Sequence, residues 1–159
     1  MLKALVCYFS KTGNTEQMAQ KIQQILQEEG LEADLKKTHE IQAKDFLGYD
    51  CLIFGSPTYY GTMAWELKKL LDESVAFHGR LKGKTGGAFS SSANVGGGNE
   101  TTVMDILKAL LIHGMIIQGN PKGDHYGPVA IGAPDKRALT CCEQLARNLA
   151  KLTKMAAAS

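Results

Sequence analysis

The sequence predicts an α/β fold in which five parallel strands form one doubly wound sheet. The first observation is that short apolar runs, such as residues 2–9, do not alternate with polar residues, which is typical of strands covered on both faces. The second is that helical spacing of apolar residues recurs between these runs. The third is length, because 159 residues suit one domain, which we assign to 1–159.

The first 37 residues supply two strands and one helix. The strand at 2–9 leads through a polar loop into a helix over 15–29, which Gly30 ends in the usual position of a C-terminal cap. A weaker pattern predicts the second strand at 32–37. The apolar positions of the helix follow the i, i+4, i+7, i+8 stripe of an amphipathic segment: Met18, Ile22, Ile25 and Leu26.

The same alternation continues to the end of the chain. Strands are predicted at 51–55, 84–90 and 115–117, with glycines in the fourth strand where another element packs closely. Helices are predicted at 63–71, in the segment that ends at His113-Gly114, and at 135–154. An irregular segment rich in glycine and proline precedes the last helix. The middle helix has the clearest apolar stripe: Val103, Ile106, Leu107, Leu110 and Leu111.

Charge and composition exclude several classes of protein. The net charge of +2 gives no basic stripe for nucleic acid, and no run approaches the ~18 apolar residues of a membrane span. The apolar start of the chain lacks the features of a signal peptide, so we expect a cytoplasmic protein. Four histidines and four cysteines lack metal-ligand spacing, which predicts no metal site, and the cysteines are interpreted as small buried hydrophobes.

The loop after the first strand predicts a phosphate site. Its hydroxyls, glycine and amide lie between a buried strand and a helix N-terminus, where free N–H groups and the helix dipole favour an anion. The loop lacks both the dinucleotide fingerprint and the Gly-Lys-Ser/Thr of a nucleoside-triphosphate loop, so a monophosphate ester fits better. An ordinary capped helix start is the alternative. The loop reads Ser10-Lys11-Thr12-Gly13-Asn14-Thr15.

Two further loops follow later strands. The loop at 56–61 holds adjacent tyrosines, which form a flat apolar wall with polar tips. The loop at 90–99 combines serines and asparagines with three glycines that allow the main chain to approach a ligand. Ligands of open α/β sheets bind outside the carboxyl ends of the strands. Together the three loops therefore predict one site for a phosphorylated aromatic ligand.

The loop motifs carry a family resemblance. Ser-x-Thr-Gly-Asn-Thr resembles the phosphate loop of flavodoxins. The run 55–61, the serine loop with its glycines at 96–98, and His113-Gly114-Met115 are similar to FMN-dependent NAD(P)H:quinone reductases of the tryptophan-repressor-binding-protein type. The resemblance covers nearly the whole chain. It implies the strand order 2-1-3-4-5 and FMN as cofactor.

The resemblance also implies roles for individual residues. The phosphate would be held by Ser10, Lys11, Thr12, Gly13, Asn14 and Thr15. One edge of the isoalloxazine ring would be lined by Pro57, Thr58, Tyr59, Tyr60 and Gly61. The other side would be closed by Ser90, Ser91, Ala93, Val95 and Gly96. His113 matches a position that lines the quinone pocket, although a cation at a helix C-terminus is an alternative interpretation of it. Tyr126 would border the substrate pocket, or only pack.

Three functions remain open at this level. The first is an oxidoreductase that passes electrons from NAD(P)H through FMN to a quinone-like acceptor. The second is a one-electron carrier between redox proteins, and the third is binding without turnover. The absence of aromatic residues from 91–99 favours the first, because one flavin face would be open, and the net charge of +2 differs from the acidic surface typical of carriers. Tyr59 and Tyr60 could also form the edge of a homodimer.

Overall fold

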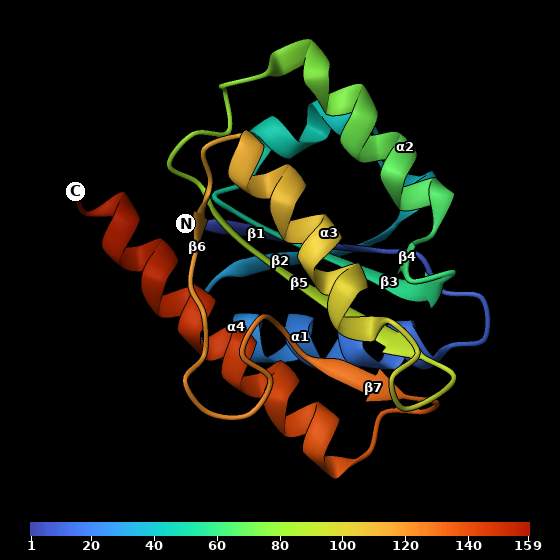
Figure 1. Ribbon diagram of the computed structural model, residues 1–159. Helices are drawn as coiled ribbons and strands as arrows, with labels where there is room; N and C mark the ends of the chain where they lie inside the picture. The colour runs from blue at the N-terminus through green and yellow to red at the C-terminus, as the bar shows by residue number, and fades with distance from the viewer.

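The computed structural model describes all residues, 1–159, and contains one mainly parallel sheet (Figure 1). The main path of the sheet runs β2-β1-β3-β5-β6, which confirms the predicted order. β7 pairs with β5 in parallel, and the short β4 forms an antiparallel hairpin with β3. The strands are β1 (Lys3–Tyr8), β2 (Glu32–Lys37), β3 (Cys51–Tyr59), β4 (Thr62–Met63), β5 (Thr85–Ser92), β6 (Ile116–Ile117) and β7 (Val129–Ile131).

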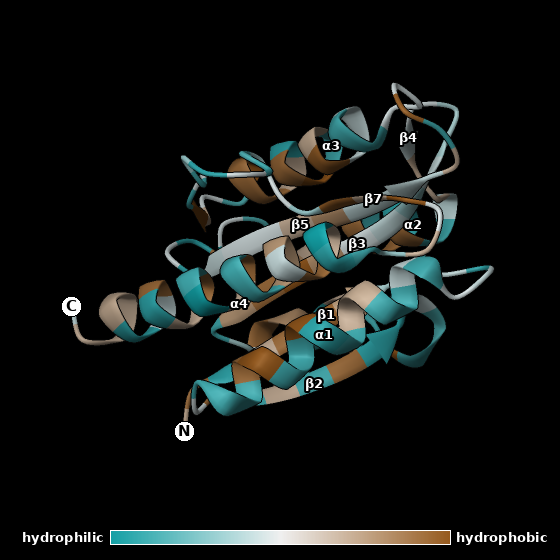
Figure 2. Cartoon of the chain, turned by 90° about the horizontal axis from the view of Figure 1, so that it is seen from below, coloured by the Kyte–Doolittle hydropathy of each residue, from teal (hydrophilic) through white to brown (hydrophobic).

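Helices cover both faces of the sheet. Figure 2 looks onto the face covered by α1 and α4, and α2 and α3 lie on the opposite face. Three 3₁₀ turns join the helices and strands on the α2 side. The bounds are α1 (Asn14–Glu28), α2 (Trp65–Glu73), α3 (Asn99–Ile112) and α4 (Lys136–Ala157), with η1 (Thr38–Glu40), η2 (Ala43–Gly48) and η3 (Ser74–Phe77).

The two layers of helices enclose two apolar cores. Successive residues of β1 point to opposite faces, so that Val6 packs with α1 and α4, whereas Leu5 packs with α2 and α3. Both side chains are fully buried. This explains why the strand does not alternate in polarity, since neither of its faces meets water.

Glycines allow close packing on β5, as the sequence predicted. A Cβ at Gly87 would lie 2.8 Å from a methyl group of Leu149 in α4, and one at Gly86 would lie 2.8 Å from Met115. All four cysteines are buried and free. Burial raises the pKa of Cys51 to about 11, so this thiol stays protonated. None of the helices has the length and apolar composition needed to cross a membrane.

Two strands extend further than the sequence predicted. β3 continues from residue 55 to Tyr59, and β5 continues from residue 90 to Ser92. The residues of these extensions are mostly polar, which made them resemble loops. The reason for their strand conformation is pairing, because Ser56 and Pro57 lie in register with Ser90 and Ser91.

β7 lies inside the segment predicted to be irregular. Its three residues are flanked by Gly127-Pro128 and Gly132, so it was too short to stand out as a strand. It pairs with the C-terminal end of β5, where Val129, Ala130 and Ile131 lie opposite residues 90–92. β6 pairs with the N-terminal end of the same strand. The last helix therefore starts at the same edge of the sheet as α1.

Candidate functional site

The structure brings the three predicted loops to one edge of the sheet, at its carboxyl end (Figure 1, right). The first loop is linked to β5 by a hydrogen bond of 2.9 Å between the hydroxyls of Thr15 and Ser91. The ring of Phe9, before the first loop, meets the ring of Tyr59 edge-on at a centroid distance of 6.3 Å. The second and third loops also contact each other, so the three segments form one continuous surface.

The β1–α1 loop leaves backbone donors free at the start of α1. Gly13 precedes the helix in the left-handed conformation, with φ of 97°, and no side chain caps the helix. The Ser10 hydroxyl accepts from the amides of Gly13 and Glu16, at 3.1 and 3.4 Å. No hydrogen bond within the chain uses the amides of Asn14 and Thr15. Free N–H groups at the positive end of a helix dipole form a site for an anion such as a phosphate.

The side chains of this loop differ in what they offer. Lys11 and Thr12 are exposed, whereas Thr15 is buried and its hydroxyl is bonded to Ser91. Thr15 therefore offers its amide to a ligand and uses its side chain to fix the loop. The carboxylate of Glu16, behind the loop, accepts a hydrogen bond of 2.7 Å from Tyr8, which helps to hold its pKa below the usual range.

The second loop is a tight turn that presents tyrosines. Tyr60 and Gly61 both have positive φ, of 50° and 80°, which is typical of the type I′ turn that joins β3 to β4. Tyr60 is fully exposed, and Tyr59 is 39% exposed with its pKa raised by partial burial and by Glu66. Pro57 and Thr58 lie within β3. Two phenol rings therefore edge the site, as the wall of a planar ligand requires.

The third segment divides into a buried and an exposed part. Ser90 and Ser91 are buried in β5, and the Ser90 hydroxyl donates to the carbonyl of Ser56 at 2.8 Å. Their side chains support the site from beneath, and their hydroxyls already have partners within the chain. Ala93, Val95 and Gly96 are exposed beyond the strand. The open wall of the site is thus main chain and small side chains.

Comparison with known proteins identifies the family. The family model described as "Flavodoxin domain" matches residues 5–109. A protein named "Flavodoxin" from Aquifex aeolicus is 37% identical over 95% of this chain and 86% of its own length. The chain belongs to the flavodoxin family.

Other members of the flavodoxin family carry enzyme names. A protein named "NAD(P)H dehydrogenase (quinone)" from Sinorhizobium fredii is 34% identical over 76% of this chain and 72% of its own. The solved structure of oxidised Flavodoxin 2 from Bacillus cereus superposes with a TM-score of 0.81 at 26% identity, over 94% of this chain and 98% of that one. The resemblance read from the sequence is confirmed. The protein is an FMN-dependent redox protein of the flavodoxin type.

The residues at the edge of the sheet fit FMN. The free amides and the left-handed glycine at the start of α1 match a phosphate, which carries roughly −1.5 to −2 charges. The turn at Tyr59–Gly61 comes at the end of β3, and the open loop at 93–98 follows β5, the strand paired beside it. FMN has one phosphate and one planar ring, so each part meets a surface of suitable chemistry.

His113 does not lie at this flavodoxin site. It follows the C-terminus of α3, one helix length of about 20 Å from the loop at 93–98. Its ring is buried, its Nε2 lies 2.7 Å from the hydroxyl of Ser74, and its Nδ1 has no partner. Burial, and then His78, lower the pKa of His113. The structure thus places His113 at the far end of α3 from the three loops, and its lowered pKa disfavours the alternative of a cation against the helix dipole.

Tyr126 also lies away from the three loops. It is half exposed in the segment before β7, and it shares its surroundings with Cys141 and Leu145 of α4. The sequence placed it near the substrate pocket because it did not reveal β7. The residues that do reach the carboxyl edge from this segment are Ile131 and Gly132, next to Ser92. Only a three-residue apolar run followed by glycine signalled them.

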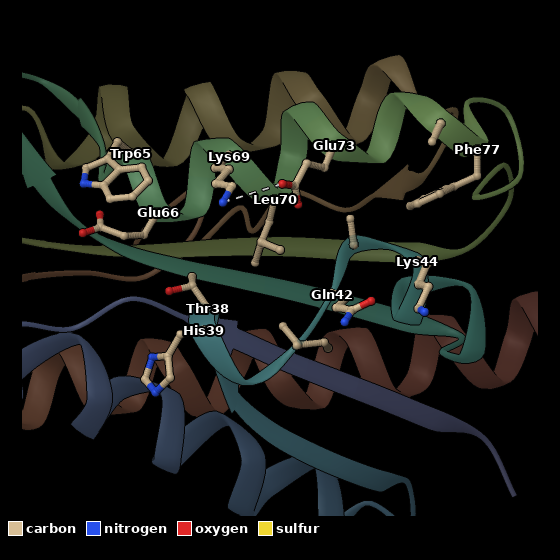
Figure 3. A pocket seen from close by; sticks show the side chains of 13 residues that line it. Thr38, His39, Gln42, Lys44, Trp65, Glu66, Lys69, Leu70, Glu73 and Phe77 are labelled. Carbon is tan, nitrogen blue, oxygen red and sulfur yellow. Dashed lines mark ion pairs between the residues drawn. The ribbon is translucent and has the colours of Figure 1, made fainter.

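A groove of about 600 Å³ lies beside the flavodoxin site, between α2 and the turns η1 and η2 (Figure 3). Trp65, the first residue of α2, stands at one end of it and is 69% exposed. Its lining contains both positive and negative side chains, and Lys69 Nζ lies 3.9 Å from Glu73 Oε1. Because the groove has no surplus of cations or free amides, the phosphate is better matched by the start of α1.

Proposed function

We propose that this flavodoxin transfers electrons from NAD(P)H through FMN to a quinone-class acceptor. The observation that carries the proposal is the unequal pair of walls around the site. The turn at 59–61 presents two tyrosines, whereas the loop at 93–98 presents glycines and small side chains. A ring held between them would have one face open to a second flat molecule, which suits the exchange of a hydride or electrons between planar reactants.

The chain's own residues bind and orient, because bound FMN supplies the redox chemistry. The amides of Asn14 and Thr15 would bind the phosphate, with Ser10 fixing the loop from within. Tyr59 and Tyr60 would line one edge of the ring. Ala93, Val95 and Gly96 would close the other side with main chain, leaving room for substrate. The names of relatives, such as the "NAD(P)H dehydrogenase (quinone)" from Sinorhizobium fredii, support this assignment.

A one-electron carrier is the second candidate. It is favoured by the relative named "Flavodoxin" that matches nearly the whole chain. Against it stands the net charge of +2, because carriers are steered to basic partners by acidic surfaces. A carrier needs a protein partner at the exposed edge of the ring, whereas an enzyme needs space over its face.

The two candidates separate in one anaerobic experiment. The FMN-loaded protein is mixed with NADH or NADPH, and the visible absorbance of the flavin is followed before and after adding benzoquinone. We expect bleaching by a nicotinamide and recovery with the quinone, at catalytic turnover. If neither nicotinamide bleaches the flavin, but a flavodoxin reductase protein does, the enzyme proposal is wrong and the carrier assignment replaces it.

A further inference from the structure

The two walls of the flavin site touch at a pair of glycines. A Cβ built on Gly98 would lie 2.8 Å from the Cα of Gly61, so the main chains are in direct contact and only glycine fits. Gly61 belongs to the β3–β4 turn, and Gly98 is the residue before α3. We call Gly61, Gly98 and Thr101 the clasp, because Thr101 ties the other two together.

The Thr101 hydroxyl bridges the contact. Its Oγ1 lies 2.5 Å from the carbonyl oxygen of Gly61 and 2.9 Å from that of Gly98. The Gly98 carbonyl already accepts the amide of Thr102 at 3.0 Å, as in an ordinary first helical turn. A hydroxyl has one proton to donate, so the proton of Thr101 goes to Gly61, which is the shorter contact.

A second tie lies beneath the clasp. Thr102 Oγ1 lies 3.1 Å from Thr58 Oγ1, which lies 3.1 Å from Ser90 Oγ, which lies 2.8 Å from the carbonyl oxygen of Ser56. Thr58 can donate to Ser90, and Ser90 donates to the carbonyl of Ser56, whereas the Thr102 hydroxyl has its shorter contact, of 2.9 Å, with the carbonyl of Gly98. This largely buried chain holds β3, β5 and α3 together. The turn itself is tied to α3 by two exposed contacts: Thr101 at Gly61, and the hydroxyl of Thr62, which donates to Asp105 Oδ2 at 2.7 Å.

The turn needs such a restraint. Tyr60 has φ of 50°, a conformation that is uncommon for residues other than glycine, and its side chain is fully exposed with no packing to fix it. β4 has only two residues, so the hairpin is short. A turn of this kind would sample other conformations unless a contact from outside held it.

We propose that Thr101 is a positioning residue that preforms the flavin cleft by holding the turn at 59–62 against the start of α3. The proposal rests on FMN as cofactor and deepens the proposed function. A preformed cleft binds its ligand more tightly, because the cost of ordering the turn is met before the ligand arrives. Without the hydroxyl, FMN binding has to order the turn.

The test compares three variants as apoproteins: Thr101→Val, which keeps the shape but removes the donor, Thr101→Ser, which keeps the donor, and Thr140→Val. Thr140 is a matched control, since its hydroxyl donates to the carbonyl of Lys136 on the exposed surface of α4. FMN affinity is measured by the quenching of flavin fluorescence, and the visible circular dichroism of bound flavin reports the ring's surroundings. Thermal unfolding is recorded for each apoprotein.

We expect Thr101→Val to raise the Kd for FMN about tenfold, as the loss of one typical hydrogen bond would. We also expect its visible circular dichroism to change. Thr101→Ser and Thr140→Val should bind FMN like the wild type, and the unfolding temperature of the Thr101→Val apoprotein should stay close to that of Thr140→Val.

Two results would overturn the proposal. One is an unchanged Kd in Thr101→Val, and the other is a loss of affinity that Thr101→Ser does not rescue and that parallels a loss of apoprotein stability. Failure of the proposed function is a separate result. If NAD(P)H does not reduce the wild-type flavin, the affinity series still decides whether the clasp acts.

Discussion

Two helices begin at the same edge of the sheet, and they begin differently. α4 has a side-chain cap, because the Asp135 carboxylate accepts a hydrogen bond of 2.8 Å from the amide of Ala138. α1 begins after Gly13, which provides no side-chain cap, and the amides of its first two residues, Asn14 and Thr15, have no partner in the chain. The same kind of helix end is thus closed in one place and open in another.

The difference shows that one helix start stabilises the fold, whereas the other is available to bind a ligand. A carboxylate at a helix start satisfies orphan N–H groups and stabilises the fold by about 1 kcal/mol. A left-handed glycine forgoes that gain and leaves the positive end of the dipole available to a ligand's anion. α3 also begins after a left-handed glycine without a side-chain cap, and its start faces the same site.

Closing the start of α1 with a carboxylate should have the largest effect. In Gly13→Asp, a negative group would stand where the phosphate binds, and we expect FMN affinity to fall at least roughly a hundredfold, since like charges in contact cost several kcal/mol. Gly13→Asn is the matched control, because asparagine has the same shape and tolerates the left-handed conformation without the charge. Equal affinities of the two variants for FMN, measured by fluorescence quenching, would contradict a phosphate at this position.

Opening the start of α4 should affect stability alone. Asp135→Ala removes the cap, and we expect the free energy of unfolding to fall by about 1 kcal/mol in urea titrations. FMN affinity should not change, because this helix start has no role in the proposed binding of phosphate. Asp135→Asn should keep most of the stability. If Asp135→Ala lost FMN affinity but kept its stability, the start of α4 would also take part in binding, which contradicts the separate roles of the two helix starts.

The far end of α3 offers a pH-dependent contrast with its open start. The pKa of His113 is lowered in the folded protein, so the unfolded chain binds its proton first as the pH falls below about 6.5. We expect this residue to contribute a loss of stability from that pH downward, and none above it. His113→Gln should reduce the fall in unfolding temperature between pH 7.5 and 5.5, whereas His39→Gln, at an exposed site, should not. An unchanged pH profile in His113→Gln would contradict the buried neutral ring.

The smallest effect is expected at the exposed cation of the first loop. Lys11→Gln removes a surface charge near the proposed phosphate, where exposed ion pairs contribute roughly 0.2 to 1 kcal/mol. FMN affinity should therefore fall only about two- to fivefold at low salt and less at high salt. If Lys11→Gln lost more FMN affinity than Gly13→Asp, the phosphate would be bound by this side chain and not by the backbone amides.

The sheet and its helices were predictable because burial on two faces leaves a strong pattern in the sequence. Residues 2–9 are apolar apart from Lys3, residues 51–55 contain no polar side chain, and the strands of both runs lie in the middle of the sheet. The C-terminal ends of β3 and β5 were not predictable. Ser56 and Ser90 are buried there with hydrogen-bonded polar groups, so the sequence shows no apolar run at these positions. Polar residues near glycines have the composition of loops even when they belong to strands.

The loops of the site were predictable from their composition, but the links between them were not. Thr15 and Ser91 are 76 residues apart, and nothing local to either residue indicates their hydrogen bond. The place of His113 could not be read from its motif either. Its motif matched by order along the chain, but a helix of 14 residues carries it to the far end of the sheet. The composition of a loop can therefore indicate a binding site. Whether a given residue belongs to that site depends on where the helix or strand that carries it ends.

The divided outer strand has a consequence for association between molecules. β6 and β7 cover the two ends of β5, and between them the chain passes so close that a Cβ at Gly127 would lie 2.1 Å from the carbonyl oxygen of Ala88. Along this side the polar main-chain groups of β5 are thus shielded from the strands of other molecules, which protects a sheet from aggregation. A methyl group at residue 127 would push this segment outward and expose the middle of β5 to its neighbours.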